Sequence, residues 1–352
     1  MDLYFLDERF SPIDGPIDEF TSVVWSEKYH EVGSFTLHFP RSLVSRVTGA
    51  AYVRCSPAEN GGRVFCGRIE YLTTSDDGGC EMGGHLLECL LRDRLMYGKG
   101  SYSGSVTTAA LEAVSDNLRN DSVTSLTIAS DNALITDSVT VGYSWENLSD
   151  WLYDLLTPYG ASYRIELDAE TMKPVFKIIK GEDLTSDTVV DAQPAIFSAS
   201  FGNVVAIEME KRSEGMKNVV YVEGSDGTVV TLNKSGGGHS REVYKKASDI
   251  DPDDFSSTAA YTSALGVRAA EVLAKLGESV YVSAECDTDA LPRYGTDYHL
   301  GDICDIVDDE LCLSFGMRLT SVDTVIEGGV KMIYPSFGDE VRYIRQIMKN
   351  QQ

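Results

Sequence analysis

Short runs in which apolar and polar residues alternate dominate residues 1–98. Phe35, Leu37 and Phe39 alternate with polar neighbours, and a period of two predicts strands with one buried face. Turn-rich pieces separate these runs, as in a small antiparallel barrel or sandwich. We therefore expect a first β domain here, closed by a short helix that contains the leucines of residues 86–91.

The period of the pattern changes between residues 99 and 185. Residues 106–118 and 145–156 carry apolar side chains at helical spacing, so each predicts an amphipathic helix. Ser144 stands where it can cap the second helix. Two alternating runs around the polar turn at residues 168–174 then predict a hairpin. This part is expected to form an α/β module inserted after the first β domain.

A second β domain is predicted from residues 186–245 and 279–345, where alternating runs return. Between these two pieces, residues 246–278 form a helical insert, because apolar side chains recur on one stripe from Ser257 to Leu276. The predicted fold class is α+β and mainly β, with two β-barrel domains and α/β and helical inserts.

The net charge of the chain indicates which binding partners are unfavourable. Thirty Lys and Arg residues stand against 55 Asp and Glu residues, a net charge of −25. A surface of this sign repels phosphate, which argues against tight binding to nucleic acid or anionic lipid. No apolar run of membrane-spanning length occurs, and the N-terminus lacks the pattern of a signal peptide. We expect synthesis in a cytoplasm and no membrane anchor.

The cysteines and histidines form no metal-binding or redox motif. The seven cysteines lack C-x-x-C spacing, and their odd number indicates reduced, mostly buried thiols. They are Cys55, Cys66, Cys80, Cys89, Cys286, Cys304 and Cys312. Asp249, Asp251 and Asp253 have the spacing that opens a calcium loop, but Asp254 and Ala260 replace its glycine and its glutamate. No metal or cofactor is expected.

Motifs of catalysis are absent from the sequence as well. It contains no P-loop, no strand-linked G-x-G-x-x-G, no H-E-x-x-H and no G-x-S-x-G. A pair of glycosidase carboxylates leaves no sequence signature, because its spacing in space decides the chemistry. Trp25, Trp145 and Trp151 could stack on sugars, but core packing is the favoured interpretation. We therefore expect no enzyme and no catalytic residues.

Four segments in order resemble the hub proteins of long-tailed phages, the family that includes the N-terminal part of tail-associated lysins and the hubs of contractile baseplates. They are residues 25–40, 84–94, 201–224, and 298–306 with 318–322 and 333–338. The residues that match the family's structural signature are Trp25, Tyr29, Gly33, Phe35, Pro40, Arg94, Asn218, Gly224, Tyr298, Gly301, Asp302, Arg318 and Gly338. Gly33 is expected to permit a tight turn.

The resemblance implies two related hub barrels in each subunit, so that a homotrimer closes a quasi-sixfold ring between tail tube and tail tip. It places the chain in the virion tail tip, where DNA passes through the ring without specific binding. The implied partners are a distal tail protein, the tail tube or tape measure, and a tip or receptor-binding protein. The lysin-bearing members continue further than Gln352, so wall hydrolysis is expected to belong to a partner.

Two alternatives remain open from the sequence. Two β-rich parts, aromatic residues and many acids also suit a carbohydrate-active enzyme or carbohydrate-binding module. A distal tail or fibre-adaptor protein is the other alternative, and it would form a ring of six instead of three.

Overall fold

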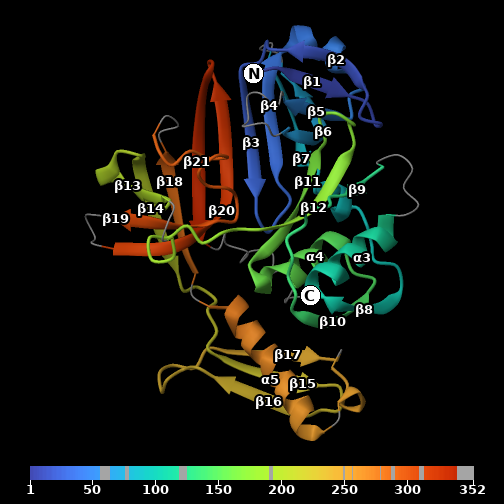
Figure 1. The fold of residues 1–352 in the computed structure, drawn as a ribbon, viewed down its shortest axis with the longest axis vertical. Helices are drawn as coiled ribbons and strands as arrows, with labels where there is room; N and C mark the ends of the chain where they lie inside the picture. Colours follow the sequence, from blue (N-terminus) through green and yellow to red (C-terminus); the bar gives the residue numbers. More distant parts are fainter. Residues whose placement is uncertain are drawn as a thin grey trace. The chain divides into compact units, whose positions relative to one another are not determined.

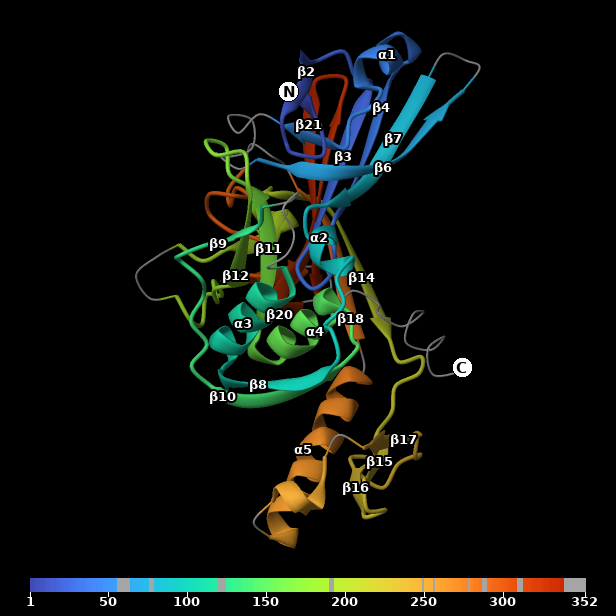
Figure 2. The same ribbon diagram turned by 90° about the vertical axis from the view of Figure 1, so that its right-hand side faces the viewer.

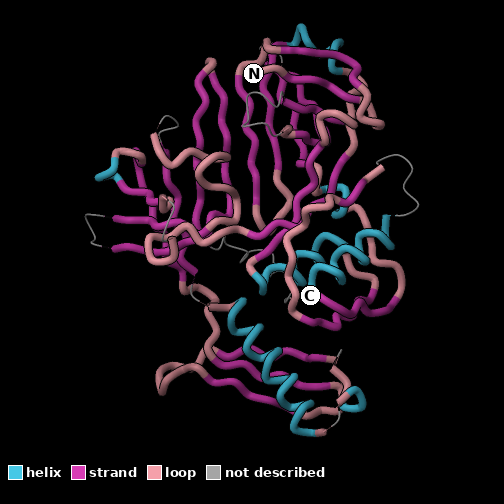
Figure 3. Tube along the Cα trace, in the orientation of Figure 1, coloured by secondary structure: helices cyan, strands magenta, loops and turns pink. Residues whose placement is uncertain are grey.

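The computed structural model describes residues 1–55, 64–75, 79–118, 125–189, 193–248, 250–255, 257–277, 279–286, 290–308 and 313–338. Strands predominate over helices in these residues (Figure 3), which confirms the mainly β class. The chain divides into two compact units, Met1–Glu208 with Val282–Glu340 and Met209–Tyr281 with Val341–Gln352. The limits of the four segments expected from the sequence stay predictions.

The largest sheet joins the two ends of the sequence. Its N-terminal strands are β1 (Leu3–Leu6), β2 (Pro12–Ile17), β3 (Ser22–Lys28), β4 (Ser34–Pro40), β5 (Tyr52–Cys55), β6 (Cys66–Thr74) and β7 (Gly79–Leu86). Its C-terminal strands are β13 (Ile196–Ser198), β14 (Val204–Arg212), β18 (Ser279–Cys286), β19 (Ile303–Asp308), β20 (Leu313–Glu327) and β21 (Val330–Gly338). The order is β14-β18-β21-β20-β3-β4-β7-β6-β5-β1-β2, with β19 on β20 and β13 on β19.

The seam of this sheet is the antiparallel pair β3 and β20, which lie side by side in Figure 1. Their register runs from Ser22 opposite Glu327 to Lys28 opposite Ser321. The two β-rich ends of the chain therefore share one ladder of backbone hydrogen bonds, and neither end forms a sheet by itself.

The predicted alternation explains how the first β-rich part is packed. Phe35, Leu37 and Phe39 on β4 are 2%, 2% and 3% exposed, as expected from their period of two. Trp25 on β3 packs on Phe35 with ring centroids 5.2 Å apart. Burying side chains of this size contributes about 2 kcal/mol each. The segment between β4 and β5 holds the short helices η1 (Arg41–Leu43) and α1 (Val44–Val47).

The next part of the chain is an α/β module, as predicted. Helix α2 (Cys89–Arg92) follows β7 and closes the first β-rich part, and Leu86, which the sequence placed in this helix, ends β7 instead. The module contains β8 (Lys99–Ser105), α3 (Val106–Leu118), β9 (Thr127–Ile128), β10 (Ser138–Ser144), α4 (Leu148–Leu156), η3 (Thr157–Tyr159), β11 (Ala161–Leu167) and β12 (Pro174–Lys180). The helix at residues 106–118 and the hairpin of β11 and β12 are confirmed. Figures 1 and 2 show α3 and α4 side by side beside the two-stranded sheet of β8 and β10.

The start of α4 corrects the sequence-based prediction. The helix begins at Leu148, and its N-cap is Asn147, whose side chain accepts hydrogen bonds from the amides of Ser149 and Asp150. Ser144 instead ends β10. Trp145 has a left-handed φ of 54° and is 53% exposed, so its predicted role in the core is wrong. The left-handed residue cannot continue a helix, which delays the helix start by three positions.

The second unit is a small α/β layer. Strands β15 (Val219–Gly224), β16 (Val229–Asn233) and β17 (Glu242–Ala247) form one sheet. Helix α5 (Thr258–Lys275) packs on it, and Ser257 caps the helix by accepting from the amide of Ala260. The predicted stripe is confirmed, because the buried side chains of α5 include Leu265, Ala269 and Leu273. The short helix η5 (Pro252–Asp254) precedes α5. In the first unit, the short helix η4 (Ala199–Phe201) precedes β14.

Candidate functional site

Tyr29 connects three separate parts of the chain immediately after β3. Its side chain is completely buried. Its hydroxyl donates a hydrogen bond to the carbonyl of Gly160 over 2.9 Å and accepts one from the amide of Gly181 over 3.1 Å. Its own amide donates to the carbonyl of Thr320 over 2.8 Å. Burial raises the pKa of Tyr29, so the hydroxyl keeps its proton and remains a donor.

Gly301 and Arg318 complete the surroundings of the Tyr29 ring. The Arg318 guanidinium donates to the carbonyl of Gly301 and lies 5.7 Å from the centroid of the Tyr29 ring. Gly301 has a φ of +101°, and a Cβ there would lie 2.3 Å from Cε2 of Tyr29. Backbone conformation and space therefore both require glycine.

Asp302 fixes the adjacent loop. Its carboxylate accepts from the amide of Glu182 over 2.8 Å and from the amide of His299 over 2.7 Å, and its side chain is buried. The first bond ties the residues that follow β12 to the residues that precede β19. We refer to the set that meets here as the junction, which consists of Tyr29, Gly160, Gly181, Gly301, Asp302 and Arg318. Its role in the geometry is structural, because its polar groups bind other segments of the chain.

The structure thus brings together Tyr29, Gly301, Asp302 and Arg318 out of the signature set. Tyr298 lies nearby on the chain and packs edge-on against Phe197, with centroids 5.0 Å apart. No sequence pattern indicates that Gly160 and Gly181 belong to the junction, because their hydrogen-bond partner Tyr29 is more than a hundred residues away.

The other signature residues lie apart from the junction. Trp25 and Phe35 belong to the first core. Gly33 has no left-handed φ, but a Cβ would lie 2.5 Å from the carbonyl oxygen of Ser26, so close packing restricts it instead of turn geometry. Pro40 ends β4, and Gly338 ends β21 with a φ of +94°. The Arg94 carbonyl accepts from the amide of Leu148.

Two signature residues belong to the second unit. Asn218 precedes β15, where its side chain donates to the carbonyl of His239 over 3.0 Å and accepts from the amide of Arg241 over 2.7 Å. Gly224 ends β15, and a Cβ there would lie 1.9 Å from the hydroxyl oxygen of Tyr261. Both residues are explained by the fold of this unit.

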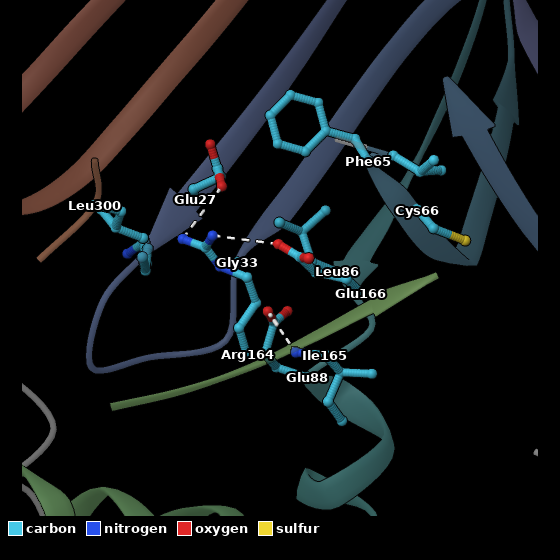
Figure 4. A pocket seen from close by; sticks show the side chains of 12 residues that line it. Glu27, Gly33, Phe65, Cys66, Leu86, Glu88, Arg164, Ile165, Glu166 and Leu300 are labelled. Atoms are coloured by element: carbon cyan, nitrogen blue, oxygen red, sulfur yellow. Dashed lines mark hydrogen bonds and ion pairs between the residues drawn. The ribbon is translucent and has the colours of Figure 1, made fainter. Parts of the chain in front are cut away.

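A group of charged side chains, of which Glu27 and Glu88 are buried, lines a small cavity in the first unit, shown in Figure 4. Arg164 on β11 lies 3.7 Å from a carboxylate oxygen of Glu27 and 3.3 Å from one of Glu166. Glu27 also accepts from the hydroxyl of Tyr294 over 2.8 Å. Glu88, next to α2, is 8% exposed, and burial raises its pKa to about 7. The sequence shows Glu88 as an acid among leucines, but it does not show its neighbours.

The described residues contain no group of three or more His, Cys, Asp or Glu side chains that could hold a metal ion. Asp249 of the calcium-like spacing lies outside the described residues, and the Asp251 carboxylate accepts from the amide of Asp253 over 3.0 Å, as a helix cap. No helix in the described part of the chain is long and apolar enough to cross a membrane.

Five cysteines within the described ranges are buried, as predicted, and Cys286 is half-buried. The buried ones are Cys55, Cys66, Cys80, Cys89 and Cys304. Burial raises the pKa of Cys66 and Cys304, and it raises that of Cys89 to about 12. Cys312 lies outside the described residues.

Comparisons with known proteins identify the fold and the family of the chain. Among curated proteins, none matches the chain by sequence. A tail protein from Neisseria meningitidis MC58 is similar in structure, with a TM-score of 0.60, 11% identity, and coverage of 97% of this chain and 96% of that chain. The 43 kDa tail protein of prophage MuSo2 from Shewanella oneidensis is similar as well, with a TM-score of 0.56, 10% identity, and coverage of 96% of this chain and 97% of that chain.

The prophage tail protein gp18 from Listeria monocytogenes EGD-e is also similar, with a TM-score of 0.55 and 12% identity over 99% of this chain and 98% of that chain. Because these sequence identities are low, the structural similarity establishes a shared fold and nothing further. The family of siphovirus ReqiPepy6 Gp37-like proteins matches residues 3–339, which is nearly the whole sequence. The chain therefore belongs to the siphovirus ReqiPepy6 Gp37-like family.

Proposed function

We propose that this protein is the hub subunit of the tail tip, and that three copies form a ring between the tail tube and the tip. The observation that carries this proposal is the single sheet in which β3 pairs with β20, together with tail-protein neighbours that match over nearly their full length. A rigid sheet that contains both ends of the chain gives each subunit two β-rich parts in a fixed relation. Three such subunits supply six similar parts to a ring.

The junction supports this role because it makes the first unit rigid. Tyr29, Asp302 and Arg318 tie β20, the α/β module and the residues before β19 to one another through hydrogen bonds. A ring subunit that lies between two protein layers has to keep its shape, and these hydrogen bonds hold separate segments of the chain in fixed positions. In this proposal the chain has no catalytic role, and wall hydrolysis and receptor binding belong to partner proteins of the tail tip.

The oligomeric mass tests the proposal directly. A ring closed by heterologous contacts has a defined number of subunits. We expect light scattering behind size-exclusion chromatography to give three times 38.5 kDa at high protein concentration. A strictly monomeric protein would contradict the hub assignment, and a hexamer would support a distal tail or fibre-adaptor protein instead.

A carbohydrate-binding surface is the second candidate function, because one specific observation favours it. Tyr97 is 80% exposed and Trp145 is 53% exposed, and their rings meet edge-on with centroids 4.7 Å apart. Exposed aromatic faces can stack on sugars. Binding to host-wall glycans that is lost in Trp145→Ala and retained in the buried control Trp151→Phe would establish it.

A further inference from the structure

Glu88 is a buried carboxyl group with incomplete hydrogen bonding. Its side chain is 8% exposed, and it lies at the N-cap of α2, against β11. One carboxyl oxygen accepts a long hydrogen bond of 3.4 Å from the amide of Ile165. The other oxygen has no hydrogen-bond partner within the described part of the chain. A buried carboxylate in this position would lack the partners that normally offset its desolvation.

The ionisable groups around Glu88 come from every element packed against it. They are Glu27 and Lys28 on β3, Cys66 on β6, Tyr153 on α4, and Tyr163, Arg164 and Glu166 on β11. Burial raises the pKa of Cys66, Tyr153 and Tyr163 far above neutrality. The pKa of Cys89, the neighbour of Glu88 on α2, is raised likewise. These four groups are therefore neutral.

The charges that remain do not balance a third carboxylate. Lys28 is paired with Glu31 at 3.3 Å. Arg164 already faces two carboxylates, Glu27 at 3.7 Å and Glu166 at 3.3 Å. An ionised Glu88 would add a negative charge to a buried site whose arginine is already shared between these two. Figure 4 shows Arg164 between Glu27 and Glu166, with Glu88 against the backbone of Ile165.

A small cavity lies beside Glu88, between β11 and the strands β3, β6 and β7. A cavity of about 20 Å³ is lined by Glu27, Glu88, Arg164 and apolar neighbours that include Phe65 and Leu86. That volume is enough for one water molecule with several polar partners. One water solvates an ionised carboxylate only in part, so full solvation of Glu88 requires its surroundings to open.

We propose that the seam between α2 and β11 is a proton-controlled joint, which protonated Glu88 holds closed and ionised Glu88 loosens. In the closed seam the neutral carboxyl is compatible with its apolar surroundings. Loss of the proton requires solvation, which the seam provides by opening around the cavity. The joint lies between the first β-rich part and the α/β module, so it controls how firmly that module is attached. The inference does not depend on the hub assignment.

The pH range in which the joint opens follows from the direction in which the pKa of Glu88 is shifted. The pKa of Glu88 is raised to about 7 from its ordinary value of 4.5 in the closed seam, chiefly because burial disfavours the charged form. In the open seam, solvated Glu88 titrates near the ordinary value. Closure is therefore strongest below about 4.5, weakens by about tenfold per pH unit as the pH rises toward 7, and is constant at higher pH.

Hydrogen exchange tests the joint. The exchange of the Ile165 amide and its β11 neighbours is measured from pH 5 to 8 in the wild type, Glu88→Gln and Glu166→Gln. Glu88→Gln keeps the shape of the side chain and removes its proton equilibrium. Glu166→Gln is the matched control, because it neutralises the half-exposed partner of the same arginine. Comparison at equal pH cancels the intrinsic pH dependence of exchange.

We expect the seam opening of the wild type, relative to Glu88→Gln, to increase about fortyfold from pH 5 to 7 and to level off by about pH 8. Glu166→Gln should still show the increase. Equal pH dependence in the wild type and Glu88→Gln overturns the proposal. If Glu88→Gln fails to fold, carboxyl-labelled glutamate NMR of the wild type decides, since one buried glutamate titrating near 7 supports the joint and ordinary titration of every glutamate contradicts it.

Discussion

Gly301 is constrained by backbone conformation and by space at the same time. Replacement by alanine places a Cβ 2.3 Å from the Tyr29 ring on a backbone with φ of +101°. The left-handed backbone costs about 1–2 kcal/mol, and the overlap costs about 1–3 kcal/mol more because Tyr29 is held by hydrogen bonds. We expect Gly301→Ala to lower the free energy of unfolding by about 3 kcal/mol in urea denaturation.

Gly329→Ala is the matched control for this substitution. Gly329 also has a positive φ, of +82°, but nothing lies within 4 Å of the position that a Cβ would take there. It should cost only about 1 kcal/mol. Equal losses in the two variants would mean that the Tyr29 ring yields and that the junction is not rigid.

The thiols give a second prediction at this scale. Cys55, Cys66, Cys80, Cys89 and Cys304 are buried, and the thiolate is the reactive form. We expect these five to react slowly with a thiol reagent in the native protein at pH 7. Denaturation without reductant should expose close to all seven thiols. Recovery of one or none would reveal disulfides and contradict the reduced state predicted from the odd count.

The start of α4 provides a test at the scale of the element. Asn147 caps the helix through its side-chain oxygen and donates from its nitrogen to the carbonyl of Arg92. Asn147→Ala loses both interactions, so it should lower the free energy of unfolding by about 1–2 kcal/mol. Ser144→Ala changes the residue that the sequence favoured as the cap, and it should stay within about 0.5 kcal/mol. Thermal unfolding of both variants measures the difference, and the reverse order would restore Ser144 as the cap.

Elements with local signals were predictable from the sequence, and those fixed by distant contacts were not. The helix at residues 106–118 and the stripe of α5 follow from apolar periodicity, which depends only on near neighbours. The start of α4 could not be predicted, because Trp145 adopts a left-handed backbone that no sequence pattern signals. The surroundings of Tyr29 and Glu88 were equally inaccessible, because their partners are distant in sequence: Ile165 is 77 residues from Glu88, and Thr320 is 291 residues from Tyr29.

At the scale of the whole molecule, the acidity of the chain is unevenly distributed. Residues 209–281 contain nine Lys and Arg and eleven Asp and Glu, a net charge of −2. The remaining sequence therefore carries −23 of the total of −25. The unit that contains the large sheet is the part from which a ring wall would be built, and it is the strongly acidic part.

This distribution leads to a prediction about DNA. If the hub ring surrounds the DNA path, an acidic wall repels phosphate and releases no counterions, so DNA moves past it without being held. A basic wall would gain affinity at each phosphate contact and would slow the passage. We expect no mobility shift of duplex DNA at about 50 mM salt, and a ring lumen with more Asp and Glu than Lys and Arg. Tight, salt-sensitive binding would show that basic side chains gather on one face despite the net charge, and the ring would then grip DNA instead of letting it pass.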